Sequence, residues 1–164
     1  PRFWQPVIPT FQKHFGLTCR SSLLDVGCAK GFMLHDLIEL IPDITVSGVD
    51  VSDYAIAHAM DDIKSKVQVA DARDLPFADN SFDVVISINT IHNLDRDDCA
   101  QALREIERVS RKGSFITVDA YRNDDEKERM FAWNLTAKTI MSVEGWVSFF
   151  KEVGYTGDYF WFVP

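Results

Sequence analysis

Short apolar runs alternate with helical stripes along residues 22–119. The runs have the composition of strands that are buried on both faces of a parallel sheet, and they occupy 22–27, 45–51, 66–70, 82–88 and 114–119. Between them, apolar residues recur at helical spacing in segments that begin after Gly31, Ser52 and Asp97. This alternation predicts an α/β fold with a doubly wound, mostly parallel sheet.

The last part of the chain has a different pattern. A charged, solvated patch at 124–127 precedes a helical face formed by Met130, Trp133, Ala137 and Ile140. Ser142 is the expected N-cap of a second helix that ends at Gly154, and the aromatic stretch 155–163 is typical of a strand. No repeat, low-complexity segment or linker is visible, so the sequence predicts a single domain over 1–164.

Composition narrows the class of protein. The 164 residues are 46% hydrophobic and carry a formal charge of −8, which excludes a disordered chain and disfavours nucleic acid as a partner. The three cysteines lack the spacing of a zinc site, so we expect no metal, and reduced thiols in a cytoplasmic protein. No apolar run reaches the roughly 18 residues that span a bilayer.

Candidate ligand-binding residues lie in the loops that follow the predicted strands, where ligands of such sheets bind. The first loop, 25–31, has the pattern G-x-A-x-G and leads into a helix N-terminus, which favours a carboxylate or a phosphate. Asp50 ends the second strand, where an acidic side chain can accept hydrogen bonds from ribose hydroxyls. Asp71 can accept from an exocyclic amine, and the polar loop 89–94 suits a reacting centre. Taken alone, an aspartate at a strand end such as Asp50 is usually a helix cap or a turn residue, and the glycine loop before it favours the ribose contact.

Four motifs in order carry a family resemblance. The segments LLDVGCAKGFML, SGVDVS, VADARDLPFADNSFDVVISINTIHNL and REIERVSRKGSFITVDAY resemble the motifs of class I S-adenosylmethionine-dependent methyltransferases, in particular the type-11, ubiquinone-biosynthesis-like group. The match covers residues 20–121 and implies a Rossmann-like sheet of seven strands whose last strand is antiparallel. No seventh strand is visible after 155–163, so we expect a sheet that lacks it, with an open edge that favours a homodimer.

The resemblance implies a division of the domain and a set of cofactor contacts. Residues 1–18 would form a lid or helix region, 20–121 the cofactor-binding core, and 122–164 the substrate-side helices and last strand. The loop glycines would lie beside the methionine part of S-adenosylmethionine, Asp25 would favour its ammonium group, and Asp50 would hold the ribose. The implied cofactor-binding residues are Asp25, Gly27, Cys28, Ala29, Gly31, Asp50, Val51, Asp71, Ala72 and Asn89.

Catalytic and acceptor residues are less clearly marked. His92 is the first candidate for a general base because it follows the fourth strand and titrates near neutrality, and Asp119 and Tyr121 are the next. A structural histidine and ordinary strand-end capping are the alternatives. Two sets of aromatic residues have a possible role at the site. A lid over the cofactor could consist of Phe3, Trp4, Phe11 and Phe15, and the walls of an acceptor pocket could consist of Trp133, Trp146, Tyr159 and Trp161. Core packing is the alternative for both sets.

The expected function is methyl transfer to a small-molecule acceptor by in-line displacement at the sulfonium, with S-adenosylhomocysteine as product. One alternative is a catalytically silent domain that binds the cofactor or scaffolds a partner. A remote alternative is a nicotinamide-dependent reductase, but the first loop lacks the G-x-G-x-x-G pattern because Phe32 stands where the third glycine belongs.

Overall fold

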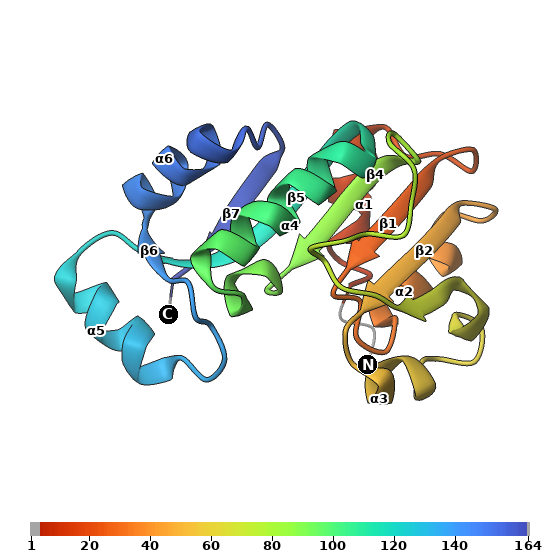
Figure 1. The fold of residues 1–164 in the computed structure, drawn as a ribbon. Coiled ribbons are helices and arrows are strands. Elements are labelled where there is room, and N and C mark those ends of the chain that lie inside the picture. The colour runs from red at the N-terminus through yellow and green to blue at the C-terminus, as the bar shows by residue number, and fades with distance from the viewer. Residues whose placement is uncertain (1–3, 164) are drawn as a thin grey trace.

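A sheet of parallel strands forms the centre of the structure, a computed structural model that describes residues 4–163 (Figure 1). The strands are β1 (Ser22–Val26), β2 (Thr45–Asp50), β3 (Val67–Val69), β4 (Phe82–Ile88), β5 (Ser110–Tyr121), β6 (Met141–Ser142) and β7 (Asp158–Phe162). Within the described range the order is β3-β2-β1-β4-β5-β6, and β7 pairs with β5. Since β1 lies between β2 and β4, the strand order reverses there, and this switch point is where ligands of such sheets bind.

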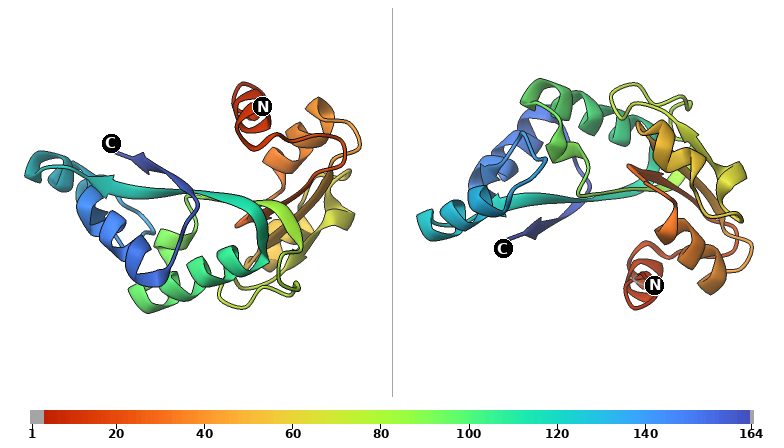
Figure 2. Two further views of the ribbon diagram at one scale, coloured as in Figure 1. Left: turned by 90° about the horizontal axis from the view of Figure 1, so that it is seen from above. Right: turned by 90° about the horizontal axis from the view of Figure 1, so that it is seen from below.

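Helices cover both faces of the sheet (Figure 2). They are α1 (Ile8–Phe15), α2 (Phe32–Leu40), α3 (Asp53–Ala57), α4 (Arg96–Val109), α5 (Asp124–Trp133) and α6 (Val143–Val153), with 3-10 turns η1 (Lys64–Lys66) and η2 (Ile91–Asn93). In β4, Val85 packs in the core under α4 and α6, whereas Val84 and Ile86 pack in the core under α1 and α2. The doubly wound fold is therefore confirmed, and burial on both faces explains why the strands are continuously apolar.

The expectation that the sheet lacks a seventh strand is wrong for the described residues. The described chain has seven strands, because the two-residue β6 adds to the sheet beside Ala120 and Tyr121. The last strand, β7, runs parallel to β5, and every strand pairing in residues 4–163 is parallel. The antiparallel last strand that the resemblance implied is therefore not found in this range.

Two element boundaries also differ from the prediction. The fifth strand begins at Ser110 and not at Ser114, because Asp83 of β4 holds Arg111 and Lys112 in ion pairs of 2.9 and 3.1 Å. The helix after Ser52 ends at Ala57, because the N–H of Met60 donates to the carbonyl of Lys30 in the first loop.

The C-terminal helices are partly as predicted. Ser142 caps α6 through the N–H of Gly145, and Gly154 ends it in a left-handed conformation, as expected. The helix α5 begins inside the charged patch 124–127, since Asn123 accepts from the N–H of Glu126, and it stops before Ala137. In residues 4–163 no helix has the length and apolar character that crossing a bilayer requires.

Trp146 connects α6 to the end of β5, and its substitution tests this packing. The side chain is fully buried, and its Nε1–H donates to the carbonyl of Asp119 at 2.8 Å. We expect Trp146→Phe to lower the free energy of unfolding by about 2 kcal/mol, because it removes a buried hydrogen bond and leaves a small void. Urea unfolding measures this. The control Trp133→Phe, at a half-exposed side chain, should change it by less than about 0.5 kcal/mol; equal effects would contradict the assignment.

Candidate active site

A cavity of 480 Å³ lies where β1, β2 and β4 end, at the switch point of the sheet. Seven of the predicted cofactor residues line it: Gly27, Ala29, Asp50, Val51, Asp71, Ala72 and Asn89. The sequence did not predict four other residues of the lining, which come from the third and fourth loops: Arg73, Thr90, Asn93 and Leu94. Their position in loops that were already singled out was the available signal. The volume is in the range of pockets that hold drug-sized ligands.

The carboxylate of Asp50 joins the first two loops. One oxygen accepts from the N–H of Ala29 at 2.8 Å, and the other accepts from the N–H of Ser52 at 2.9 Å. Each oxygen keeps a further lone pair, so the carboxylate can still accept from a ligand hydroxyl. Its orientation is therefore fixed before any ligand binds.

The first loop needs glycine at its ends. Gly27 has φ +85°, and a Cβ there would lie 2.1 Å from Oγ1 of Thr90 in the fourth loop. Gly31 has φ +78°, and its Cβ would lie 2.6 Å from the side chain of Ile63. Ala29 also adopts a positive φ, at 47°, a conformation that costs a non-glycine residue about 1 kcal/mol. The loop thus lies close to its neighbours and stores a little strain.

Asp25, Cys28 and Gly31 do not line the cavity with their side chains or backbone. Asp25 is buried behind the loop, and burial, followed by the charge of Asp50, raises its pKa to about 7. The Cys28 side chain packs in the core under α2, and burial raises the pKa of its thiol, which makes it unreactive. Cys19, Cys28 and Cys99 are all free, as the sequence predicted.

The carboxylate of Asp71 forms an ion pair with Arg73. The guanidinium of Arg73 pairs with Asp71 and, at 2.8 Å, with Asp98 of α4. The hydrogen bonds from Arg73 lower the pKa of Asp71, so this carboxylate stays ionised. An adenine amine would therefore share Asp71 with Arg73.

A smaller cavity of 180 Å³ adjoins the first one at Asn89. Its lining includes His92, Asp119 and Trp133. Nδ1 of His92 accepts from the backbone N–H of Asp119 at 3.0 Å, and burial lowers the pKa of His92 to about 4. His92 is therefore neutral with its proton on Nε2. Burial raises the pKa of Asp119, whose carboxylate lies 3.9 Å from the His92 ring.

The structure does not bring all predicted catalytic and aromatic residues together. Tyr121 lies under the ammonium of Lys127, which is 5.6 Å from its ring centroid, and lines neither cavity. Trp146 is core, and Tyr159 and Trp161 stack around Phe150 of α6. Of the predicted acceptor walls, Trp133 alone reaches the cavity beside Asp119.

The predicted lid has a different place. Trp4, Phe11 and Phe15 line a third cavity, between α1 and the sheet, and not the one at the switch point. Phe11 packs edge-on against Phe115 of β5, with ring centroids 4.9 Å apart. Phe3, the fourth predicted lid residue, lies outside the described residues. Tertiary packing on the sheet face thus takes the place of the expected lid.

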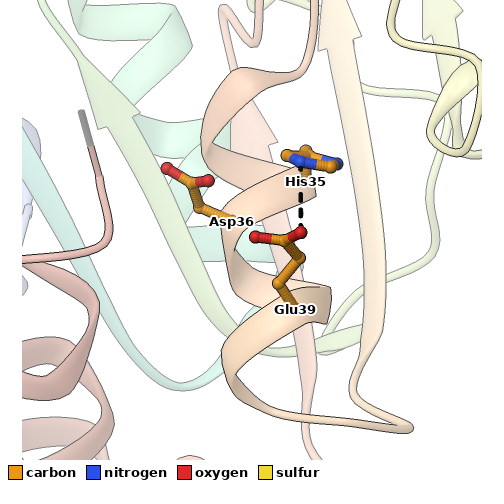
Figure 3. Close-up of side chains that lie close together, drawn as sticks. All are labelled: His35, Asp36 and Glu39. Carbon is orange, nitrogen blue, oxygen red and sulfur yellow. Dashed lines mark ion pairs between the residues drawn. The ribbon is translucent and has the colours of Figure 1, made fainter. Parts of the chain in front are cut away.

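One group of potential metal ligands lies on α2. Figure 3 shows His35, Asp36 and Glu39, with the ion pair between His35 and Glu39 marked. Asp36 also accepts from the N–H of Trp4, and His35 contacts Asp62 at 2.7 Å. Protein partners thus engage these ligand atoms, and we assign no metal site to them.

Comparisons with known proteins place the chain in a family. The family described as methyltransferase domain matches residues 24–118, more than half of the chain. The chain belongs to the methyltransferase domain family. The resemblance to class I, type-11 methyltransferases is therefore confirmed, and the family implies a cofactor of the S-adenosylmethionine type.

Individual relatives agree with this assignment. The O-methyltransferase rstn1 of Aspergillus nomiae is 35% identical over 103 residues, which are 58% of this chain and 44% of the relative. The tRNA (carboxymethyluridine(34)-5-O)-methyltransferase of Arabidopsis thaliana is 32% identical over 130 residues, 77% of this chain and 30% of that protein. The chain thus spans less than two thirds of the length of these curated relatives.

A solved structure shares the fold. The YcgJ protein of Bacillus subtilis has a TM-score of 0.69 at 22% identity, over 89% of this chain and 66% of that one.

The residues around the methyltransferase cavity fit such a cofactor. Asp50, in the lining, supplies negative charge toward a cationic ligand, and Asp71 adds to it beside Arg73. The carbonyl oxygen of the Asn93 side chain is buried without a hydrogen-bond partner at the wall of the cavity. A buried acceptor without a partner is costly, and a ligand donor would satisfy it.

The raised pKa of Asp25 makes the stability of this methyltransferase depend on pH. The folded state keeps the Asp25 proton up to about pH 7, whereas the unfolded chain loses it near 3.8. This stabilising term is complete below the unfolded pKa and is lost as the pH rises to about 7. It changes by at most about 1.4 kcal/mol per pH unit.

We therefore expect Asp25→Asn to gain free energy of unfolding relative to the wild type between about pH 4 and 7, and to keep a constant advantage above that range. Urea unfolding at a series of pH values measures the difference. Asp61→Asn, at an exposed carboxylate, is the control. A difference that does not vary with pH would contradict the burial of an ionisable Asp25.

Proposed function

We propose that this chain binds S-adenosylmethionine in the cavity at the switch point and transfers its methyl group to a small-molecule acceptor beside Asn89. The observation that carries the proposal is that one cavity, in a member of the methyltransferase domain family, collects residues from the loops after β1, β2, β3 and β4. When bound, S-adenosylmethionine supplies a methyl group that is already activated on a sulfonium, so positioning and exclusion of water account for most of the catalysis.

Each loop has a proposed task. Gly27 and Ala29 would lie beside the methionine part. Cys28 and Gly31, which do not line the cavity, would hold this loop in shape, because the N–H of Gly31 donates to the carbonyl of Cys28. Asp50 would accept from the ribose hydroxyls, and Val51 would pack against the adenine. Asp71 and Ala72 would contact the adenine edge, and Asn89 would lie at the methyl end. Asp25 would favour the ammonium group, and the nearby cation would in turn lower its pKa.

The lining of the smaller cavity supports different roles for His92 and Asp119, two of the predicted catalytic residues. His92 is neutral, and its Nδ1 accepts from the N–H of Asp119, so the proton on Nε2 leaves the ring no acceptor for a substrate proton. We therefore propose Asp119 as the base that takes the proton an acceptor hydroxyl loses as its oxygen is methylated. His92 would position Asp119. Tyr121 has no proposed role in this step.

The class of acceptor remains part of the proposal. The formal charge of −8 supports a small molecule over a nucleic acid, while the name of the Arabidopsis relative concerns a tRNA. The name of the Aspergillus relative states methyl transfer to oxygen. We also propose a homodimer, since β7 pairs with β5 and with no other strand of residues 4–163, which leaves its outer edge open. The cytoplasmic location stays a prediction.

Asp50→Ala tests the cofactor site. We expect it to weaken the binding of S-adenosylmethionine and S-adenosylhomocysteine by about 1–3 kcal/mol, because it removes a charged hydrogen-bond acceptor and frees the first loop. Calorimetric titration measures the affinity, with NADH expected not to bind. Asp53→Ala, at an exposed carboxylate three residues away, should bind as the wild type does. Equal affinities for both variants would argue against the placement of the ribose.

Asp119→Asn tests the proposed base. We expect kcat to fall by about 10²–10⁴-fold while the affinity for the cofactor is unchanged, because the amide cannot take the proton. The wild-type rate should rise with pH through a pKa above the ordinary range of a carboxyl group, since burial raises that of Asp119. Rates are measured with an acceptor found in a screen of phenols and catechols. Asp125→Asn, at an exposed carboxylate of α5, is the control, and full activity of Asp119→Asn would refute the role.

A further inference from the structure

One face of β5 and β7 is only partly covered, and Phe160 of β7 is its exposed residue. The parallel register aligns Phe115 with Asp158 and Thr117 with Phe160, so these four side chains share one side of the sheet. The helix α1 packs on the first half of β5 through Phe11 and Phe15 and contacts the start of β7 through the His14–Asp158 pair. In both views of Figure 2, no helix of residues 4–163 covers the end of β7 on that side. Phe160 is accordingly 60% exposed, and an uncovered apolar sheet face of this kind marks a binding surface.

A cavity of 670 Å³ occupies this face, between α1 and the strands. Phe11 and Phe15 of α1 form one wall, and Phe115 and Phe160 form the other. The lining is apolar apart from a few groups at its border, among them the His14–Asp158 pair, whose atoms are 2.7 Å apart. Its size suits a small organic molecule, and its walls suit an apolar one.

This cavity meets the methyltransferase site at the end of β4. Ile88 lines both this cavity and the one at the switch point. Thr117, which lines the apolar cavity, donates from Oγ1 to Oδ1 of Asn89 at 2.8 Å, and Asn89 lines both cavities of the site. The next residue of β5 on the same face is Asp119, the proposed base. A molecule in the apolar cavity therefore has one end beside the polar groups of the site.

We infer that the acceptor is an amphiphilic small molecule: an aromatic or alkyl body that fills the cavity between α1 and β5–β7, with a hydroxyl at the end that reaches Asn89 and Asp119. This inference rests on the proposed function. The body gains by covering the exposed Phe160 and the other aromatic walls. A sugar, a free amino acid or a polynucleotide does not fit, because its polar groups would find no partners along these walls.

The test uses the full chain and the neutral fluorescent probe N-phenyl-1-naphthylamine, displaced by 4-alkylphenols of increasing chain length. We expect the affinity of the phenols to rise by up to about fourfold per added methylene. Phe160→Lys should weaken probe binding about tenfold, because it puts a charge on an apolar wall. Phe131→Lys, at a similarly exposed phenylalanine of α5 outside the cavity, should have no effect.

A second variant, Thr10→Trp, fills the cavity from the exposed surface of α1 and should also exclude the probe. The inference is overturned if the wild type does not bind the probe, or if both variants bind it as the wild type does. It is also overturned if the probe binds only at concentrations at which sedimentation shows a monomer, since a second copy would then cover this face. Titration with S-adenosylmethionine on the same samples distinguishes failure of this inference from failure of the proposed function. Cofactor binding without probe binding contradicts only this inference, and probe binding without cofactor binding contradicts the proposed function.

Discussion

The site depends on the carboxylate of Asp50, which ties together the loops that follow β1 and β2. Its two oxygens accept from the N–H groups of Ala29 and Ser52, so the first loop and the start of α3 are held by one side chain. The parallel pairing of β1 with β2 brings these loops to the same edge of the sheet. A cofactor site in such a fold is therefore built before the ligand arrives, which lowers the entropic cost of binding.

Buried acids give the two halves of the site different electrostatics. Burial and the charge of Asp50 raise the pKa of Asp25, so a cationic ligand relieves the repulsion between the two carboxyl groups. Burial raises the pKa of Asp119, which suits a group that takes up a proton. Asp71 differs from both, since Arg73 and not the ligand determines its ionisation. The surroundings thus give the same residue type different ionisation at three places in the site.

The sequence predicts what depends on local pattern. The five strands of 22–119, the glycine loop and the Asp50 and Asp71 positions are local, because each follows a short apolar run. The start of β5 was missed because it depends on Asp83, which lies 28 residues from Arg111 and pairs with it across the sheet. The sequence left lid and core open for Phe11 and Phe15, because an aromatic N-terminal helix packs as well on Phe115 as on a ligand. The sequence predicts that His92 lies near the site, because it follows β4. Its tautomer was not predictable, because it depends on the backbone N–H of Asp119, 27 residues away.

The most direct test of the account is a crystal structure of the chain with S-adenosylhomocysteine. The account predicts that the ligand lies in the switch-point cavity, with its ribose hydroxyls on Asp50, its adenine beside Asp71 and its sulfur toward Asn89. A ligand bound elsewhere, or one whose ribose does not contact Asp50, would contradict it.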